Sequence, residues 1–284
     1  MSAKPFPSIG IHLGVSEADY HAQGHEQGML SKSLLWKFLQ SPYKWKFGPG
    51  FKSTRGMAVG SLRDCLVLTP SAYAEDFVIS PYDAFRTNEA KAWKESTEKG
   101  GKTIVTQKEV DEAQAAVGKI RSHSIAGSIL ASAATQVSVV IGGTEQQTKE
   151  KFRCKCRIDI LPDANGPYKD WIFDLKITNS IPFFGKIVAQ FGYEVQAALY
   201  IDVYNLVADE NRTKWGFILQ EDTAPGEVAV MELDPEDIAA GRETYLKALA
   251  LWCQCARDNN YPSLYEDEIG MVKRPNWARK GEDQ

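Results

Sequence analysis

Three charged side chains within residues 151–178 have the types and spacing of a hydrolytic centre: Asp159, Asp174 and Lys176. The two carboxylates offer hard oxygen ligands, which Mg²⁺ and Mn²⁺ prefer in proteins. A lysine beside them can orient or help deprotonate an attacking water, and it can offset the charge of a phosphate. The residue types therefore predict a compact site for a divalent cation and a phosphate-containing substrate.

The segment that holds these residues has the pattern of two strands joined by a turn. Residues 152–161 alternate between apolar and charged side chains, and residues 171–177 repeat the alternation, because strand side chains have a period of two. The linking P-D-A-N-G-P is turn chemistry, since Gly166 tolerates positive φ and proline cannot extend a ladder. If the two strands pair with their apolar sides on one core, Asp159, Asp174 and Lys176 share the opposite face.

A row of basic residues lies on the same face of the first strand as Asp159. Arg153, Lys155 and Arg157 alternate with apolar side chains, so together they would meet a polyanion. We include them, with Thr178 at the end of the second strand, as candidate DNA contacts. The alternative is a solvated amphipathic hairpin whose charges pair loosely, since a surface ion pair stabilises a fold by only about 0–1 kcal/mol.

The composition favours one elaborated domain with a substantial core. The chain has 284 residues, of which 43% are hydrophobic and 11% are aromatic. We expect a single domain over 1–284, with an N-terminal helical part over about 1–134, a sheet over about 135–232, and a C-terminal helix and tail over 233–284. The net charge of −4 argues against a global basic field, so any DNA-binding surface must be local.

The cysteines and the N-terminal residues indicate a reducing compartment. Five cysteines, an odd number, argue against a disulfide framework, and the two C-x-C pairs lack the C-x-x-C spacing of zinc sites. The chain starts without the apolar stretch of a signal peptide, and it has no apolar run of about 18 residues. We therefore expect a cytoplasmic protein that does not engage a membrane.

Helices and further strands flank this segment on both sides. Helical patterns cover 31–42, 56–68, 107–120, 124–133, 182–190, 193–207 and 235–257, and strand patterns cover 137–141, 215–220 and 227–232. In the helix over 193–207, Gln196, Tyr200 and Tyr204 fall on one face. This order of elements predicts an α/β fold with a central mixed sheet flanked by helices.

Six motifs stand in one order along nearly the whole chain. They are S-K-S-L-L-W-K-F-L-Q-S-P at 31–42, G-S-L-R-D-C-L-V-L-T-P at 60–70, C-K-C-R-I-D at 154–159, D-L-K-I-T at 174–178, Q-A-A-L-Y at 196–200 and the terminal P-N-W-A. With these motifs the chain resembles the PD-(D/E)XK nuclease superfamily, and more closely the phage and prophage exonucleases of the exonuclease VIII (RecE) type. The resemblance implies a restriction-endonuclease-like core.

The resemblance also implies a role for each matching position. Asp159 and Asp174 would hold Mg²⁺, with Mn²⁺ as the alternative cation. Lys176 would serve the attacking water. Gln196 and Tyr200 would position the substrate or the lysine.

Two positions depart from the pattern of the resembled family. Relatives often have a histidine where this chain has Asp64, and a glutamate where we align Gln136. Aspartate can still bind a metal, whereas a neutral amide is a poorer ligand. Either Gln136 or Glu145, from the following loop, therefore supplies the remaining ligand, or fewer carboxylates carry the site.

From the residues and the resemblance we expect a Mg²⁺-dependent deoxyribonuclease. The resemblance implies a double-strand exonuclease that acts on duplex DNA with a free end and generates single strands for phage-type recombination. It further implies a ring-like homo-oligomer, a single-strand annealing recombinase as partner, and the cytoplasm of a bacterial host with a phage or prophage origin. Two alternatives stay open: a DNA-binding protein on a nuclease fold with impaired catalysis, which Gln136 makes conceivable, and a structure-specific or repair endonuclease.

Overall fold

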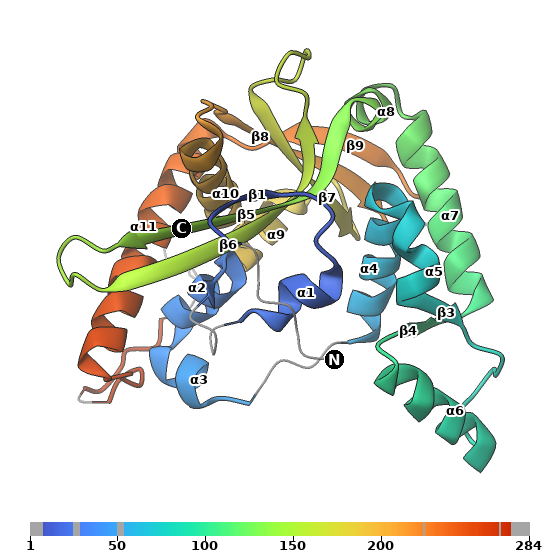
Figure 1. The fold of residues 1–284 in the computed structure, drawn as a ribbon, viewed down its shortest axis with the longest axis horizontal. Coiled ribbons are helices and arrows are strands. Elements are labelled where there is room, and N and C mark those ends of the chain that lie inside the picture. The colour runs from blue at the N-terminus through green and yellow to red at the C-terminus, as the bar shows by residue number, and fades with distance from the viewer. Residues whose placement is uncertain (1–7, 25–28, 50–53, 224, 267, 274–284) are drawn as a thin grey trace, which may run out of the picture.

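A twisted mixed sheet runs through the middle of the molecule, with helices on both of its faces (Figure 1). The computed structural model describes residues 8–24, 29–49, 54–223, 225–266 and 268–273. The strands are β1 (Gly10–His12), β2 (Met29–Leu30), β3 (Phe77–Ile79), β4 (Thr103–Val105), β5 (Ala133–Thr144), β6 (Lys151–Pro162), β7 (Trp171–Thr178), β8 (Lys214–Glu221) and β9 (Val228–Glu232). The α-helices are α1 (Glu17–Ala22), α2 (Lys32–Gln40), α3 (Pro42–Phe47), α4 (Arg55–Leu68), α5 (Tyr73–Asp76), α6 (Asn88–Lys99), α7 (Gln107–Ser122), α8 (Ser124–Ala131), α9 (Phe184–Phe191), α10 (Tyr193–Ala208) and α11 (Pro235–Asp258). The predicted mixed α/β fold is confirmed.

The seven-stranded sheet has the order β1-β5-β6-β7-β8-β9, and β2 pairs with β6 outside this path. β5 and β6 form a long antiparallel hairpin, and the predicted strands at the C-terminal end of the sheet, β8 and β9, form a second one. β7 pairs in parallel with β8 along its whole length. The N-terminal part is therefore not purely helical, because β1 pairs with β5 and β2 with β6.

β6 and β7 do not form the regular hairpin that their alternation predicts. In the described part of the chain they pair only at Ile160 and Phe173. Nearer the start of β6, its edge pairs with β2 instead, at Arg153 and Cys154. The expectation of a paired central hairpin is wrong beyond one position, and the start of the same edge of β6 is taken by β2 instead of β7.

The hairpin of β5 and β6 contributes side chains to two different cores. Val137 and Ile158, which face each other across the hairpin, are buried in one core, whereas Ile160, two residues further along β6, is buried in the other. The hairpin changes from one core to the other at Gln136, whose φ of +52° lies in the left-handed region. A non-glycine residue in this conformation inside a strand is strained. The ladder bends there, opposite Asp159.

The two cores lie on opposite faces of the sheet. One is formed with α2, α9, α10 and α11, and α10 is buried along most of its length. The other is formed with α4, α7 and α8, through side chains such as Leu68 and Ile129. In Figure 1, α2 and α11 lie in the left half of the view, where the β5–β6 hairpin crosses α11, and α4, α7 and α8 lie on the right. A smaller apolar cluster holds the start of α7 to α4 and to the two-stranded sheet of β3 and β4.

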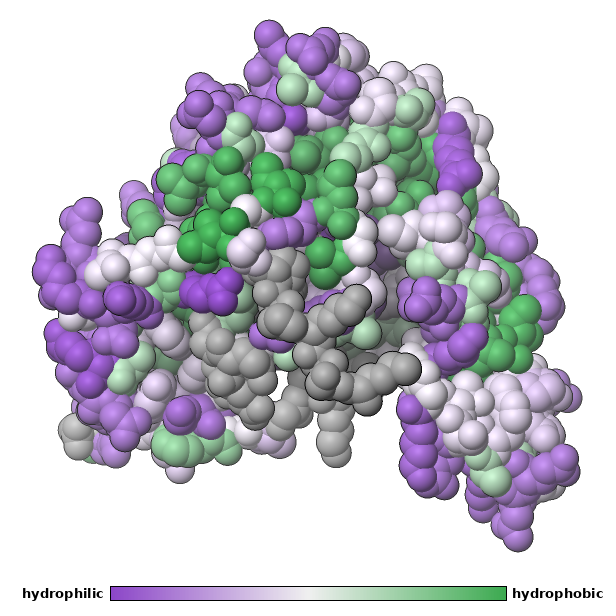
Figure 2. Space-filling view, viewed as in Figure 1, coloured by the Kyte–Doolittle hydropathy of each residue, from purple (hydrophilic) through white to green (hydrophobic). Residues whose placement is uncertain are grey.

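The edge strand β1 carries apolar side chains into solvent. Ile9 and Leu13, which flank this strand, are 60% and 69% exposed, and Ile11 is 38% exposed. Figure 2 shows the corresponding concentration of hydrophobic residues in the upper half of the view, over the position of β1 in Figure 1. This edge of the sheet is therefore apolar, unlike the charged site described below.

No helix in the described ranges has the length and apolar character needed to cross a membrane. All five cysteines are buried free thiols, and none of them pairs with another.

Candidate active site

Asp159 and Asp174 meet where β6 and β7 part. Asp159 directly precedes Ile160 on β6, and Asp174 directly follows Phe173 on the antiparallel β7, so both carboxylates lie on the same side of the single Ile160–Phe173 pair. The backbone N–H of Leu175 donates to the side chain of Asp159, at Oδ2, over 3.1 Å. The parting of the strands therefore creates the position that Asp159 occupies.

Asp174 is held by two side chains that the sequence predicts to join it. Its side chain is buried, and Oδ1 accepts a hydrogen bond from Gln196 Nε2 at 2.6 Å. Oδ2 forms an ion pair with Lys176, which confirms that these two residues point the same way. Oδ2 is nevertheless a buried oxygen without hydrogen-bond geometry to any described residue. Gln196 reaches the site from the first turn of α10.

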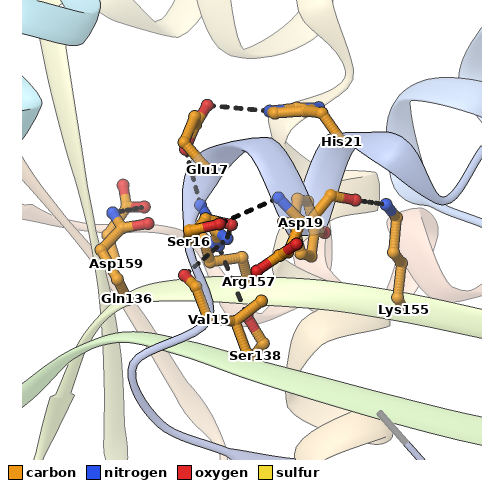
Figure 3. A network of polar contacts seen from close by, with 11 residues as sticks. Val15, Ser16, Glu17, Asp19, His21, Gln136, Ser138, Lys155, Arg157 and Asp159 are labelled. Carbon is orange, nitrogen blue, oxygen red and sulfur yellow. Dashed lines mark hydrogen bonds and ion pairs between the residues drawn. The ribbon is translucent and has the colours of Figure 1, made fainter. Parts of the chain in front are cut away.

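Gln136 faces Asp159 across the β5–β6 hairpin, and its Nε2 donates to Asp159 Oδ1 at 3.2 Å (Figure 3). The residue that sequence alignment places beside the metal ligands is thus in direct contact with one of them. Its left-handed backbone costs on the order of 1–3 kcal/mol. Strain of this kind is concentrated at functional sites.

Asp64 approaches the same carboxylates from α4, a helix capped at Thr54, whose side chain accepts from Met57 N. Burial is the main reason that the pKa of Asp64 rises to about 7. The positive charge of Lys176 lowers this pKa, whereas the negative charge of Asp174 raises it. These interactions place Asp64 near both members of the ion pair. The histidine position of the resembled family is therefore occupied here by a carboxylate whose charge interacts with Lys176 and Asp174.

The site contains more negative than positive charge. Burial and then the neighbouring Asp174 raise the pKa of Asp159 well above its ordinary value, against the effect of Lys176. Burial lowers the pKa of Lys176, but the carboxylates of Asp174 and Asp159 outweigh it and leave the pKa above its ordinary value. Lys176 is thus an ammonium at neutral pH, and the clustered carboxylates repel one another.

The side chains fit a hard divalent cation. Asp64, Asp159 and Asp174 supply carboxylate oxygens, one of which is the buried Oδ2 of Asp174 that forms the ion pair with Lys176. Burial and then carboxylate repulsion raise the pKa values of Asp64 and Asp159, and the positive charge of a bound cation would counter both effects. Within the described ranges no three His, Cys, Asp or Glu side chains already stand at ligand distance, so a cation would have to draw these three together.

Glu145, the other candidate for the remaining ligand, lies at the far end of the hairpin. It follows β5 directly, nine residues after Gln136, which corresponds to about 30 Å of strand. Its carboxylate instead accepts from Thr148 N at 2.6 Å and from Thr148 Oγ1 at 2.7 Å. Glu145 therefore organises its own turn, and of the two candidates only Gln136 stands beside Asp159.

The predicted row of basic DNA contacts is largely covered by α1. Arg157 binds Glu17 and donates to the carbonyl oxygens of Val15 and Ser16, and Lys155 donates to Tyr20 O (Figure 3). Lys155 is only 4% exposed. An open basic face on β6 is therefore not formed, because a helix distant in sequence occupies it.

The remaining predicted site residues differ in their exposure and in their distance from Asp159. Arg153 is exposed, but it lies six residues before Asp159, or about 20 Å along β6. Thr178 is buried, and its hydroxyl donates to Ser180 O within a local turn. Tyr200 packs edge-on against Trp215, with ring centroids 5.8 Å apart, and nearby Asp174 and Asp159 contribute to its raised pKa after burial.

Sequence reasoning missed two cationic residues, Lys32 and Arg63. Lys32, the first residue of α2, and Lys176 both place Nζ over the ring of Tyr193, at 5.3 Å and 4.9 Å from the centroid. The sequence does carry a signal for Lys32, because a cation in the first turn of a helix opposes the helix dipole. It also missed Arg63, beside Asp64, whose Nε and Nη1 are buried without a partner among the described residues.

Comparison with solved structures agrees with this architecture. The chain is similar to a crystal structure from Eubacterium rectale described as a candidate exonuclease, with a TM-score of 0.60 and 12% identity over 95% of this chain and 100% of that chain. It also matches a structure described as SSO0001 with a TM-score of 0.30 and 11% identity, over 70% and 87% of the two chains, which is too weak to support an argument. At such identities the first likeness shows the fold alone.

A comparison with curated proteins found no match. A family model does match residues 37–268, and this range includes Asp64, Gln136, Asp159, Asp174 and Lys176. The model describes a PDDEXK-like domain of unknown function, the superfamily that the motif order predicts. The chain therefore belongs to the family of PDDEXK-like domains designated DUF3799.

Proposed function

We propose that this protein is a metal-dependent deoxyribonuclease that hydrolyses DNA phosphodiester bonds. The observation that carries the proposal is the convergence of Asp159, Asp174 and Lys176, with Gln196 hydrogen-bonded to Asp174, at the point where β6 and β7 part. The family description and the nuclease-like fold support it. When bound, Mg²⁺ or Mn²⁺ would stabilise the charge that develops on the phosphate oxygens.

The contacts of each site residue suggest its role in this reaction. Asp64, Asp159 and Asp174 would hold the cation. Lys176, kept protonated by its acidic neighbours, would orient the attacking water and offset phosphate charge rather than remove a proton. Gln196 would hold Asp174 in one orientation through its hydrogen bond to Oδ1.

Phosphate contacts would come from cations beside this cluster and not from the covered row on β6. Arg63 adjoins Asp64 on α4, and two of its guanidinium nitrogens have no acceptor among the described residues. A buried donor without a partner costs about 1–3 kcal/mol, which a phosphate oxygen would recover. Arg63 is therefore the arginine that we assign to the DNA backbone near the reacting bond.

Within this activity we favour a double-strand exonuclease of the exonuclease VIII type that supplies single strands for recombination. Motif order supports this, together with the likeness to the described candidate exonuclease. A ring-like homo-oligomer and a single-strand annealing recombinase as partner belong to the same proposal. Light scattering tests the assembly, since a monomeric mass at working concentration contradicts the ring.

The activity is tested with end-labelled linear duplex and covalently closed circles, each with Mg²⁺ and with EDTA. The proposal expects linear DNA to be degraded only with Mg²⁺ and circles to persist. Cutting of circles would establish a structure-specific or repair endonuclease instead. The Asp174→Asn variant serves as the control for contaminating nucleases, because it should retain no activity.

A second function is favoured by one observation, the amide of Gln136 on Asp159 Oδ1. An amide adds no charge to hold a cation, which suits a DNA-binding protein with impaired chemistry. That protein would bind duplex DNA in a gel-shift assay but would leave linear DNA intact with either Mg²⁺ or Mn²⁺.

A further inference from the structure

The first turn of α2 contacts the chain at the junction between α9 and α10. Lys32 is only 7% exposed, and its Nζ donates to the carbonyl oxygen of Phe191, the last residue of α9. The same ammonium lies over the rings of Trp36 and Tyr193, at 5.7 Å and 5.3 Å. Burial is the main reason that its pKa falls to about 8. A buried cation at a helix N-terminus is costly, so packing alone does not explain this lysine.

The chain turns sharply at Phe191 and Gly192, which we call the elbow, and only glycine fits at position 192. Gly192 has a φ of +63°, and a Cβ there would lie 2.7 Å from Cε3 of Trp36. α11 packs closely against the first turn of α10, because a Cβ on Gly241 of α11 would lie 2.2 Å from Glu194 O. The start of α10 is therefore held by α2 and by α11 at close range.

Gln196 stands one helical turn beyond this elbow. Its backbone N–H bonds to Gly192 O at 3.2 Å, and its side-chain Nε2 donates to Asp174 Oδ1 at 2.6 Å. One turn of helix is stiff, so a shift of Gly192 moves Gln196 with it. A hydrogen bond weakens steeply with misalignment, so such a shift would release Asp174 from its orientation.

We propose that Lys32 is a positioning residue of the site: by holding Phe191 O it sets the start of α10, and through Gln196 it fixes the orientation of Asp174. With Oδ1 engaged by Gln196, Oδ2 is directed toward Lys176 and remains available to a cation. The importance of Asp174 for cleavage rests on the proposed function. The mechanical coupling of Lys32 to Gln196 does not depend on cleavage.

The test compares Lys32→Met, Gln196→Ala and the double variant. Methionine keeps an unbranched apolar side chain over the two rings but cannot donate to Phe191 O. We expect Lys32→Met to raise the Mg²⁺ concentration for half-maximal cleavage by about 10-fold, the lower end of the range for a lost supporting contact at a metal site. In the Gln196→Ala background the same change should have no further effect. Lys32→Arg, which can still donate, should restore most of the wild-type Mg²⁺ dependence.

The matched control is Lys44→Met, the same substitution at an exposed lysine on α3. It should leave the Mg²⁺ dependence unchanged. If Lys32→Met does not fold, Trp36→Leu perturbs the same elbow from α2 and should likewise have no effect once Gln196 is alanine. Losses that multiply in the double variant would overturn the proposal, because Lys32 would then act independently of Gln196.

A failure of the proposed function can be distinguished from a failure of the positioning role. If the wild-type protein cleaves no DNA, the coupling between Lys32 and Gln196 is measured from the urea unfolding midpoints of the variants in EDTA. Lys32→Met should lower the midpoint less in the Gln196→Ala background than in the wild type. Equal lowering in both backgrounds would overturn the positioning role.

Discussion

Gln136 donates its side-chain amide to Asp159, the residue directly opposite it on the neighbouring strand. A glutamate at this position would place a negative charge where the amide now stands, and carboxylates are better ligands for Mg²⁺. We expect Gln136→Glu to lower the Mg²⁺ concentration needed for half-maximal cleavage. Titration of initial rates against Mg²⁺ measures this, and an unchanged or higher requirement would show that residue 136 does not face the cation.

Asp174 and Lys176 form the ion pair at the centre of the site. Asp174→Asn and Lys176→Met should each reduce cleavage of linear duplex DNA by at least about a hundredfold, the scale of losing one preorganised charge contact at a reacting centre. Single-turnover rates on end-labelled DNA provide the measurement, with circular dichroism to verify the fold. Retention of more than a few per cent of the rate by a folded variant would refute the assignment.

Glu145 should affect stability but not cleavage. Its pKa is lowered to about 2, chiefly by the backbone hydrogen bond from Thr148. A lowered pKa means that the charged carboxylate favours the folded state, so its contribution is complete above about pH 4.5 and disappears as pH falls through 2. Glu145→Gln should therefore be less stable than the wild type at neutral pH, with the difference shrinking toward pH 2. Urea unfolding at several pH values tests this, and a loss of cleavage at pH 7 would contradict it.

Arg157 should act on stability more than on DNA binding. Its guanidinium ties α1 to β6 through Glu17 and the carbonyl oxygens of Val15 and Ser16. Arg157→Gln should lower the free energy of unfolding by about 1–3 kcal/mol. The exposed Arg153→Gln, on the same strand, should change it by less than about 0.5 kcal/mol. A weaker affinity for DNA without a stability change in Arg157→Gln would indicate that α1 leaves β6 when DNA binds.

Gly241 provides a test of the close contact between α10 and α11. An added Cβ would lie 2.2 Å from the backbone oxygen of Glu194, so Gly241→Ala should destabilise the fold by about 1–3 kcal/mol. Gly118→Ala is the matched control, since that glycine is exposed in α7 with nothing near its Cβ position. It should stabilise by about 0.5–1 kcal/mol. Equal effects at the two positions in urea unfolding would mean that the helices separate easily.

Local patterns in the chain predict much of the fold and the centre of the site. The strand period places Asp174 and Lys176 on one face, which agrees with the observed ion pair. This prediction succeeds because the two residues are close together in sequence, where backbone geometry alone decides which side chains are neighbours. The place of Gln196 beside Asp174 follows instead from the family resemblance, and it agrees with the observed hydrogen bond.

Long-range pairing decided what the sequence could not. The second edge of β6 pairs with β2 near its start and with β7 at only one position, and Asp159 lies where this pairing with β7 ends. Long-range packing also placed α1 over Arg157, kept Glu145 far from the cluster, and brought Lys32 to Phe191, 159 positions away along the chain. Such contacts are selected by the free energy of packing the whole chain, because no local period records which distant segment will cover a given face.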